Sequence, residues 1–256
     1  MNFVFDLDGT IYFKGQPLSS KITEALLDLI INAGHEVIFA LARLIRDMLP
    51  VLDERFHHFP LIGGNGSLGA KDGKVIHAHS FSSDVMDKIK KHIQKYEARY
   101  LTGGEWDDAY TGDKHHPILQ NLDPAKLAKC VPLETLETIV KILEELAQNI
   151  AALPVNVHRH KNENLLDISP KGINKWSSLK MFGILEKSYV AFGNDANDIP
   201  MFEQALHSVM IGHHEELANF AKEAIELDEE TEQKNVEKIH DLGNRFMKFP
   251  NEVSSS

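Results

Sequence analysis

The chain contains a single cysteine, Cys130, among its 256 residues. One cysteine cannot form an internal disulfide, so we expect a reducing compartment. The sequence also lacks an apolar stretch long enough to cross a membrane, and no charged leader followed by an apolar segment precedes the first predicted strand. Together these absences predict a cytoplasmic protein.

Positive charge is scarce as well. Lys and Arg number 27 against 38 Asp and Glu, which gives a formal net charge of −11. We therefore expect no nucleic acid and no anionic membrane among the partners. A phosphorylated small molecule would also be repelled at long range, so its site needs cations close by. The composition leaves a monomer and a small homo-oligomer equally open.

The first ten residues contain the motif on which the functional prediction depends. Residues 3–5 form an apolar run that predicts a buried strand. Asp6 and Asp8 follow, and side chains at positions i and i+2 of an extended chain point to the same side, so the two carboxylates can converge. Gly9 permits a sharp turn, and Thr10 can cap the next element. Such a pair attracts a divalent cation and can divide chemical roles; the alternative is an ordinary surface turn.

Apolar strands alternate with amphipathic helices in the first 80 and the last 85 or so residues. Strands are predicted over 3–5, 37–40, 59–62, 189–192 and 209–211. Helices are predicted over about 20–33, 44–52, 175–182, 201–205, 215–224 and 236–246. This alternation is typical of an α/β fold with a doubly wound, Rossmann-like parallel sheet covered by helices on both faces.

The pattern changes between these two regions. Amphipathic stretches at 83–96 and around 136–146, with a strand pair over 155–160 and 165–168, predict a separate α+β unit. We therefore expect a core formed by residues 1–79 and 169–256, and an inserted domain over residues 80–168. A hairpin turning at Asp72-Gly73 is predicted just before the insertion.

A second acidic cluster, Asn194-Asp195-Ala196-Asn197-Asp198, follows the strand over 189–192. Ligands of doubly wound sheets bind at the carboxyl ends of neighbouring strands, so this cluster and the first pair of aspartates can share one Mg²⁺. The alternative is a capped helix start, with Asn197 or Asp198 as the N-cap.

Lys175 is the third candidate group, because it stands at the start of a predicted helix. A lysine in that position opposes the helix dipole and is unfavourable unless an anion lies nearby. It is therefore a better candidate for a phosphate or carboxylate partner than Lys171. The alternative is an ordinary solvated lysine.

The order of these groups resembles that of the haloacid dehalogenase superfamily, in its Cof-type branch of small-metabolite phosphatases, over essentially the whole chain. Phe-Asp-Leu-Asp-Gly-Thr at 5–10 resembles motif I, Lys175 motif III and residues 193–198 motif IV. The resemblance implies that Asp6 is the nucleophile and Asp8 the general acid and base. The long insertion between motifs II and III resembles a C2-type cap.

The resemblance also implies a set of ligands. Mg²⁺ is expected on the Asp6 carboxylate, the Asp8 main-chain carbonyl and the motif IV residues Asn194, Asp195 and Asp198. Phosphate contacts are expected from Gly9, Thr10, Leu41, Ala42, Arg43, Lys175 and Asn197. Substrate contacts from the inserted domain are expected from Trp106, Asp107, Tyr110, His115 and Arg159.

The implied reaction is the Mg²⁺-dependent hydrolysis of a small phosphorylated metabolite, such as a sugar phosphate, through an aspartyl-phosphate. Two alternatives stay open. A phosphomutase of similar fold would return the phosphoryl group to a sugar hydroxyl, and would release no free phosphate. A non-catalytic protein that binds a phosphorylated metabolite would not turn over a generic aryl phosphate.

Two positions depart from the family pattern. Motif II usually offers Ser or Thr where this chain has Leu41, and a lost hydrogen bond to a transferring phosphoryl group costs roughly 1.5–3 kcal/mol, about 10–100-fold in rate. We therefore expect impaired catalysis, and about a tenfold gain in kcat/KM for Leu41→Ser. Motif IV usually begins Gly-Asp, but here it begins Gly193-Asn194. The amide of Asn194 adds no charge, and Asp195 is expected to compensate.

Overall fold

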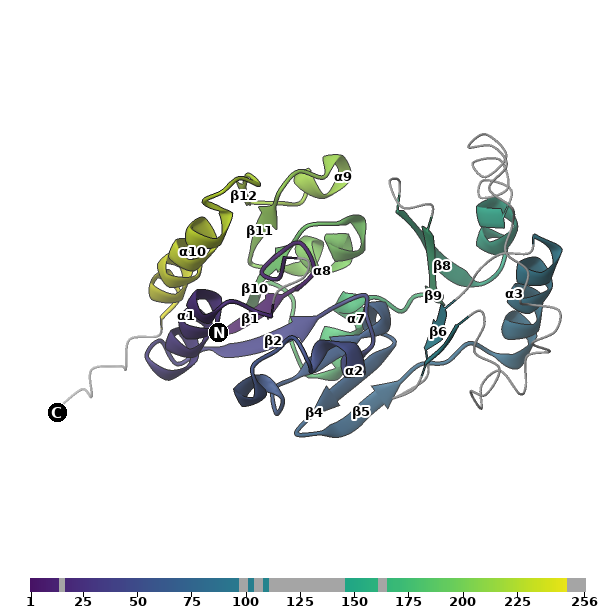
Figure 1. Ribbon diagram of the computed structural model, residues 1–256, viewed down its shortest axis with the longest axis horizontal. Helices are drawn as coiled ribbons and strands as arrows, with labels where there is room; N and C mark the ends of the chain where they lie inside the picture. Colours follow the sequence, from purple (N-terminus) through teal and green to yellow (C-terminus); the bar gives the residue numbers. More distant parts are fainter. Residues whose placement is uncertain (14–16, 97–100, 104–107, 111–145, 161–164, 248–256) are drawn as a thin grey trace.

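The structure, a computed structural model, describes residues 1–13, 17–96, 101–103, 108–110, 146–160 and 165–247. Its main sheet has eight strands. In chain order these are β1 (Asn2–Phe5), β2 (Glu36–Ala40), β3 (Leu61–Gly63), β4 (Leu68–Lys71), β5 (Lys74–Ala78), β10 (Tyr189–Gly193), β11 (His207–Ile211) and β12 (Glu223–Ile225). Their order across the sheet is β12-β11-β10-β1-β2-β3-β4-β5 (Figure 1).

Strand β1 lies inside the sheet and pairs in parallel with β2 on one side and β10 on the other. The parallel pairing continues through β11 and β12 on one flank and β3 on the other. Strands β4 and β5 form an antiparallel hairpin at the opposite edge, which confirms the predicted turn at Asp72-Gly73. The first and last thirds of the chain thus meet in one sheet, with the carboxyl ends of β1 and β10 side by side.

Helices cover both faces of this sheet, as the alternation predicted (Figure 1). They are α1 (Ser20–Ile31), α2 (Ile45–Met48), α7 (Lys175–Met181), α8 (Ile199–Gln204), α9 (Glu215–Ala218) and α10 (Thr231–Arg245), with short 3₁₀ turns η1 (Glu54–Phe56), η2 (Gly64–Gly66) and η3 (Ala196–Asp198). In the part of the chain that the structure describes, no helix is long and apolar enough to cross a membrane.

The residues of β1 alternate between two apolar layers, because successive side chains of a strand point to opposite faces. Phe3 and Phe5 belong to a cluster that includes apolar residues of α1 and α10. Val4 belongs to a second cluster, which includes Leu179 of α7 and Met201 of α8. The sheet is therefore buried on both faces, which confirms the doubly wound α/β fold.

Two predicted helices are shorter than expected. The helix predicted over 44–52 contains only Ile45–Met48, and the one predicted over 215–224 ends at Ala218. In the second case the chain returns to the sheet as β12, where Ile225 is buried and the Lys222 N–H donates to the Ser208 carbonyl. Periodicity alone did not separate a short edge strand from the end of a helix.

The inserted part contains α3 (Ser83–Lys95), β6 (Leu101–Gly103), β7 (Asp108–Tyr110), β8 (Val155–His160) and β9 (Leu165–Pro170). Figure 1 shows α3, β6, β8 and β9 to one side of the main sheet. Val85 and Ile89 of α3 pack with Ile150 and Val155 in a separate apolar cluster. The predicted boundary at 168 falls inside β9, which runs on to Pro170.

Some predictions for this part cannot be compared with the structure. Most of the helix predicted around 136–146 lies outside the described residues. The same is true of Trp106, Asp107 and His115, whereas Tyr110 and Arg159 are the β7 and β8 residues expected to contact substrate.

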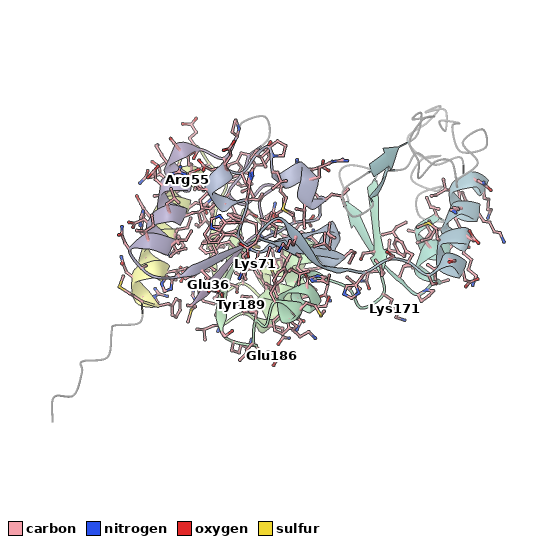
Figure 2. All side chains as sticks on the ribbon, turned by 90° about the horizontal axis from the view of Figure 1, so that it is seen from below. Glu36, Arg55, Lys71, Lys171, Glu186 and Tyr189 are labelled. Atoms are coloured by element: carbon pink, nitrogen blue, oxygen red, sulfur yellow. The ribbon has the colours of Figure 1, made fainter. Side chains whose placement is uncertain are left out.

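The segment that leads from β9 back to α7 is held by one side chain of β8. Asn156 donates through Nδ2 to the carbonyls of Pro170 at 3.0 Å and Ile173 at 2.6 Å. Its Oδ1 accepts from the Gly172 N–H at 3.4 Å. Lys171, labelled in Figure 2, belongs to this return segment and is exposed. The main chain immediately before α7 is therefore tied to the inserted strand pair.

Candidate active site

Asp6 lies at the carboxyl end of β1, where its main-chain N–H continues the parallel pairing by donating to Phe192 O at 2.9 Å. Its side chain is buried, and Oδ2 accepts from the Thr10 hydroxyl at 3.0 Å. Thr10 is itself fully buried, and its carbonyl accepts from Asn235 Nδ2 of α10 at 2.9 Å. Thr10 was expected to cap the next element or contact phosphate; in the structure its hydroxyl donates to the Asp6 carboxylate.

Lys175 begins α7 and is completely buried. Its Nζ lies 2.7 Å from Asp6 Oδ1 and 2.6 Å from Asp198 Oδ1. The start of α7 packs closely on Gly66 of η2. An added Cβ at Gly66 would lie 2.1 Å from the Asn174 carbonyl oxygen, so no larger residue fits at position 66. The prediction of an anion beside this lysine is confirmed by two carboxylates.

Asp198 has no exposed surface, and hydrogen bonds engage both of its carboxylate oxygens. Oδ1 faces Lys175, while Oδ2 accepts from the main-chain N–H groups of Asn194 at 2.8 Å and Asp195 at 3.1 Å. The carboxylate packs directly on Gly193, where an added Cβ would lie 2.5 Å from Oδ2. Asp198 was expected to hold a cation directly; in this geometry it holds Lys175 and the motif IV loop.

Burial and the neighbouring charges set the protonation of this cluster. Burial raises the pKa of Asp6 to about 7, with Lys175 opposing the rise and Asp198 adding to it. Burial disfavours the charged form of Lys175, but Asp198 and Asp6 outweigh this effect and raise the pKa of Lys175. Lys175 therefore stays charged between its two partners. A cation beside Asp6 would favour the ionised carboxylate, which is the form that can attack an electrophile.

Asp8 lies in a different environment from Asp6. Its side chain is 38% exposed, and Oδ1 lies 2.5 Å from Arg43 Nη2. The Arg43 guanidinium also lies 5.8 Å from the centre of the Tyr12 ring. Arg43 was expected to contact phosphate, and here its partner is the second carboxylate of motif I. Two carboxylates in unlike environments are suited to different chemical roles.

The motif II segment is held by β3 and by the turn η2 that follows it. The Leu41 N–H donates to Ile62 O at 2.8 Å, and the Leu41 carbonyl accepts from Asn65 N at 3.1 Å. The Leu41 side chain is 1% exposed and belongs to the apolar cluster that includes Phe39. Leu41 was expected to place apolar bulk beside a phosphoryl group; in the structure its side chain packs in this apolar cluster. Ala42, the next residue, is partly exposed.

The motif IV loop lies against the motif I turn. Gly9 has a φ of 75°, and an added Cβ would lie 2.3 Å from Asn194 Nδ2, so the turn requires glycine both for its conformation and for space. The predicted alternative of a cap was partly right. Asp198 is the N-cap residue of α8 but makes no side-chain capping hydrogen bond there, and Asp195 is the N-cap of η3. Asn197 instead donates to Asn65 Oδ1 at 3.0 Å.

Several contacts of this site were not predicted. Asn235, which holds Thr10, lies on the buried face of α10 four residues before Ile239, so a polar residue in an apolar stripe was its signal. Tyr12, beside Arg43, and His214, which lies 3.3 Å from Asp195, had no comparable signal.

The residues present fit Mg²⁺. Across the described residues, no three His, Cys, Asp or Glu side chains form a metal cluster. However, Mg²⁺ is commonly held by one or two carboxylates together with waters and substrate phosphate. Asp6 supplies one carboxylate, and the Asn194 amide lies against the adjoining motif I turn. With the main-chain carbonyl of Asp8, these are hard oxygen donors of the required kind.

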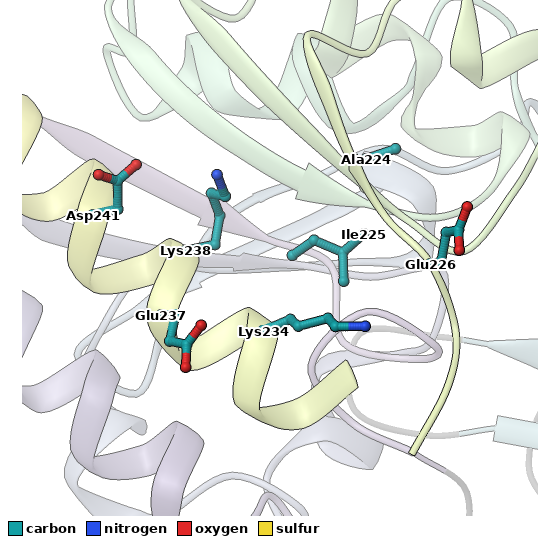
Figure 3. A pocket seen from close by; sticks show the side chains of 7 residues that line it. All are labelled: Ala224, Ile225, Glu226, Lys234, Glu237, Lys238 and Asp241. Carbon is teal, nitrogen blue, oxygen red and sulfur yellow. The ribbon is translucent and has the colours of Figure 1, made fainter. Parts of the chain in front are cut away.

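A separate hollow of about 420 Å³ lies between α10 and β12 (Figure 3). None of the predicted site residues line it. Two of its lining lysines have acidic partners, since Lys234 pairs with Asp228 and Lys238 with Glu223. The hollow therefore lacks the combination of a buried cation and converging carboxylates found around Lys175.

A sequence model of the haloacid dehalogenase-like hydrolases matches residues 3–233 of this chain. The chain belongs to this family. The match spans Asp6, Lys175 and Asp198 as well as the inserted part, so the family resemblance inferred from the motifs is confirmed.

Individual relatives of this hydrolase are distant. The Mycoplasma genitalium protein named "Putative phosphatase MG265" is 23% identical over 85% of this chain and 89% of its own length. Among solved structures, the HAD subclass IIB sugar phosphatase BT4131 is 18% identical with a TM-score of 0.71, and covers 94% of this chain and 98% of its own. TM0651 from Thermotoga maritima is 20% identical with a TM-score of 0.71, covering 97% and 98%. At these identities the structures show a common fold.

Proposed function

We propose that the chain is a Mg²⁺-dependent phosphomonoesterase of the cytoplasm, acting on a small phosphorylated metabolite such as a sugar phosphate. The observation that carries this proposal is the buried Lys175 ammonium held between Asp6 and Asp198. Asp8, two residues after Asp6 in the chain, has a more exposed side chain. The names of the M. genitalium relative and of the sugar phosphatase BT4131 support the same reaction class.

Asp6 is the nucleophile in this proposal. Its carboxylate attacks phosphorus in line, the phosphorus–ester oxygen bond breaks, and an aspartyl-phosphate forms. Thr10 and Lys175 hold the two carboxylate oxygens through the contacts described above, so the nucleophile is oriented before substrate arrives. Asp6, the Asp8 carbonyl and Asn194 would hold Mg²⁺, which would supply positive charge to offset the charge of the phosphoryl group.

Asp8 is the general acid and base. It protonates the leaving alcohol, and then takes a proton from the water that hydrolyses the aspartyl-phosphate. Its greater exposure suits a group that exchanges protons with substrate and water. Arg43 pairs with the same carboxylate and supplies positive charge beside it. Local cations of this kind offset the repulsion between a phosphate and a chain with a net charge of −11.

We further propose that the two regions predicted as residues 1–79 and 169–256 form the catalytic core. The inserted part, predicted as residues 80–168 and continuing to the end of β9 at Pro170, would form a C2-type cap. The cap would exclude bulk water and provide the contacts that select the substrate. Its attachment through the return segment directly before Lys175 supports this division.

The proposal is tested with p-nitrophenyl phosphate and a panel of sugar phosphates, using detection of released phosphate. We expect hydrolysis that depends on Mg²⁺ and is lost in Asp6→Asn. Isomerised product without free phosphate would instead identify a phosphomutase. Binding of phosphorylated metabolites without turnover of any ester would show a non-catalytic binding protein.

A further inference from the structure

The carboxylate of Asp195 is used to hold the motif IV loop together. Its Oδ1 accepts from the Ala196 N–H at 2.7 Å, and its side chain forms a reciprocal capping box with Asp198 at the start of η3. Asp195 is thus the N-cap of the turn that presents Asp198 to Lys175. A carboxylate with these main-chain partners is fixed by the loop it stabilises.

His214 adds a third neighbour to Asp195. Its Nδ1 accepts from the Leu217 N–H at 3.3 Å, so in the neutral ring the proton resides on Nε2. That Nε2 lies 3.3 Å from Asp195 Oδ1, which places an N–H donor against the same oxygen that accepts from Ala196. The side chain of Asp195 is therefore held from the loop and from the start of α9.

Asn194 differs from Asp195, because its main chain holds the loop and its side chain is directed to the motif I turn. Its main-chain N–H donates to Asp198 Oδ2. Its side-chain amide lies directly against the motif I turn at Gly9. The Asn194 side chain thus lies against the turn that directly follows Asp8, whereas the Asp195 carboxylate is bonded to the Ala196 N–H. The amide oxygen and nitrogen can be exchanged by a flip of the side chain, so an oxygen can be offered to a cation there.

We infer that Asp195 serves the loop and not the cation, so that the Mg²⁺ site contains one carboxylate, Asp6, and the neutral amide of Asn194. This inference rests on the proposed function, because it concerns the cation of that reaction. Asp195 does not supply the charge that Asn194 lacks, contrary to the expectation from the sequence. Since cation affinity depends strongly on the number of charged ligands, the wild-type site is a weak one.

The inference predicts that restoring a carboxylate at position 194 strengthens cation binding. The experiment is a titration with Mn²⁺ alone, followed by electron paramagnetic resonance of the free ion, with Mg²⁺ as competitor. We expect Asn194→Asp to lower the Kd for Mn²⁺ by roughly tenfold or more. Asn197→Asp is the matched control, because it adds the same charge to the same loop at a side chain that bonds to Asn65; its effect should be several-fold smaller.

The second arm tests Asp195 directly. Asp195→Asn keeps an N-cap residue, since Asn caps as well as Asp, and should change the Kd for Mn²⁺ by no more than about threefold. Asp195→Ser provides a second capping residue if the first variant melts early. A tenfold loss of affinity in either folded variant would show that Asp195 is a ligand and overturn the inference.

Failure of the inference is distinguishable from failure of the proposed function. If Asn194→Asp binds Mn²⁺ no more tightly than wild type, while wild type still hydrolyses phosphate esters with Mg²⁺, the inference alone is wrong. If wild type shows no Mg²⁺-dependent hydrolysis, the proposed function is wrong whatever the binding data show.

Discussion

The ammonium of Lys175 lies 2.7 Å from Asp6 Oδ1 with no part of the lysine exposed to solvent. Asp198 holds the same ammonium from another side at 2.6 Å. Three charges are therefore buried together, and two of them repel each other. The arrangement couples the geometry of the site to the stability of the fold, because neither carboxylate can lose the lysine without leaving a buried negative charge unpaired.

Replacing Lys175 by Met should destabilise the protein as well as inactivate it. Removing one partner of a buried ion pair typically costs about 3–5 kcal/mol. Urea unfolding measures the change, and Lys171→Met is the matched control, because Lys171 is exposed and lies four residues earlier. Equal stability of the two variants would contradict the buried arrangement.

Asp6→Asn should abolish turnover while the fold is retained. The neutral amide is nearly the same size and can still accept from Thr10, but it neither attacks phosphorus nor provides a charged ligand. Phosphate release and circular dichroism are the measurements, with mass spectrometry to exclude deamidation back to Asp. Substantial Mg²⁺-dependent hydrolysis by the pure variant would show that Asp6 is not the nucleophile.

Leu41→Ser should destabilise the protein without raising its activity, which reverses the expectation from the motif alone. The buried side chain packs in the apolar cluster, so the substitution removes packing and introduces a hydroxyl into the core. Losses for large-to-small changes in cores are about 2–5 kcal/mol. Thermal melting and kcat/KM for one ester should be measured together. A higher kcat/KM in a stable Leu41→Ser variant would show that the side chain at position 41 faces the phosphate.

His35 should make stability fall as the pH decreases below about 6.5, while Asp6, whose pKa burial raises to about 7, shifts stability in the opposite direction over the same range. Burial lowers the pKa of His35 below its ordinary value of 6.5, although the 2.9 Å contact with the Gly243 carbonyl opposes the shift. The unfolded chain then binds more protons than the native one, so stability is present above pH 6.5 and is lost as the pH falls through that value. The slope is at most about 1.4 kcal/mol per pH unit for one proton.

The measurement is urea unfolding from pH 7.5 to pH 5. His35→Gln should flatten the profile relative to His58→Gln, whose side chain is exposed. A residual slope is expected from His77, whose pKa is also lowered, first by burial and then by His79. A profile for His35→Gln as steep as that of the control would show that His35 does not contribute.

The main sheet and the groups around Lys175 could be predicted because each depends on a local pattern. The apolar run before Asp6 is long enough to define a buried strand, and a lysine at a helix start signals an anion nearby. These signals do not require knowledge of which strands are neighbours. The carboxyl ends of β1 and β10 then bring Asp6 and the motif IV loop together by topology alone.

What could not be predicted depends on side-chain direction and on contacts between distant segments. The direction of Leu41 depends on the path of the chain after β2, which Ile62 of β3 and Asn65 of η2 fix through main-chain hydrogen bonds. The pairing of Arg43 with Asp8 joins residues 35 positions apart, and that of Asn235 with Thr10 joins residues 225 apart. No periodicity records such pairs.

Three of the hydrogen bonds of Asn156, those to Pro170, Gly172 and Ile173, tie the return segment to β8. One end is fixed to β8, and the other enters α7 at Lys175, two residues after Ile173. Because these hydrogen bonds leave the segment little freedom, we expect a tilt of the inserted strand pair to displace Lys175, the residue that holds Asp6. A displacement of about 1 Å in a catalytic group can lower the rate about a hundredfold. The position of the inserted part would therefore set the orientation of the Asp6 carboxylate.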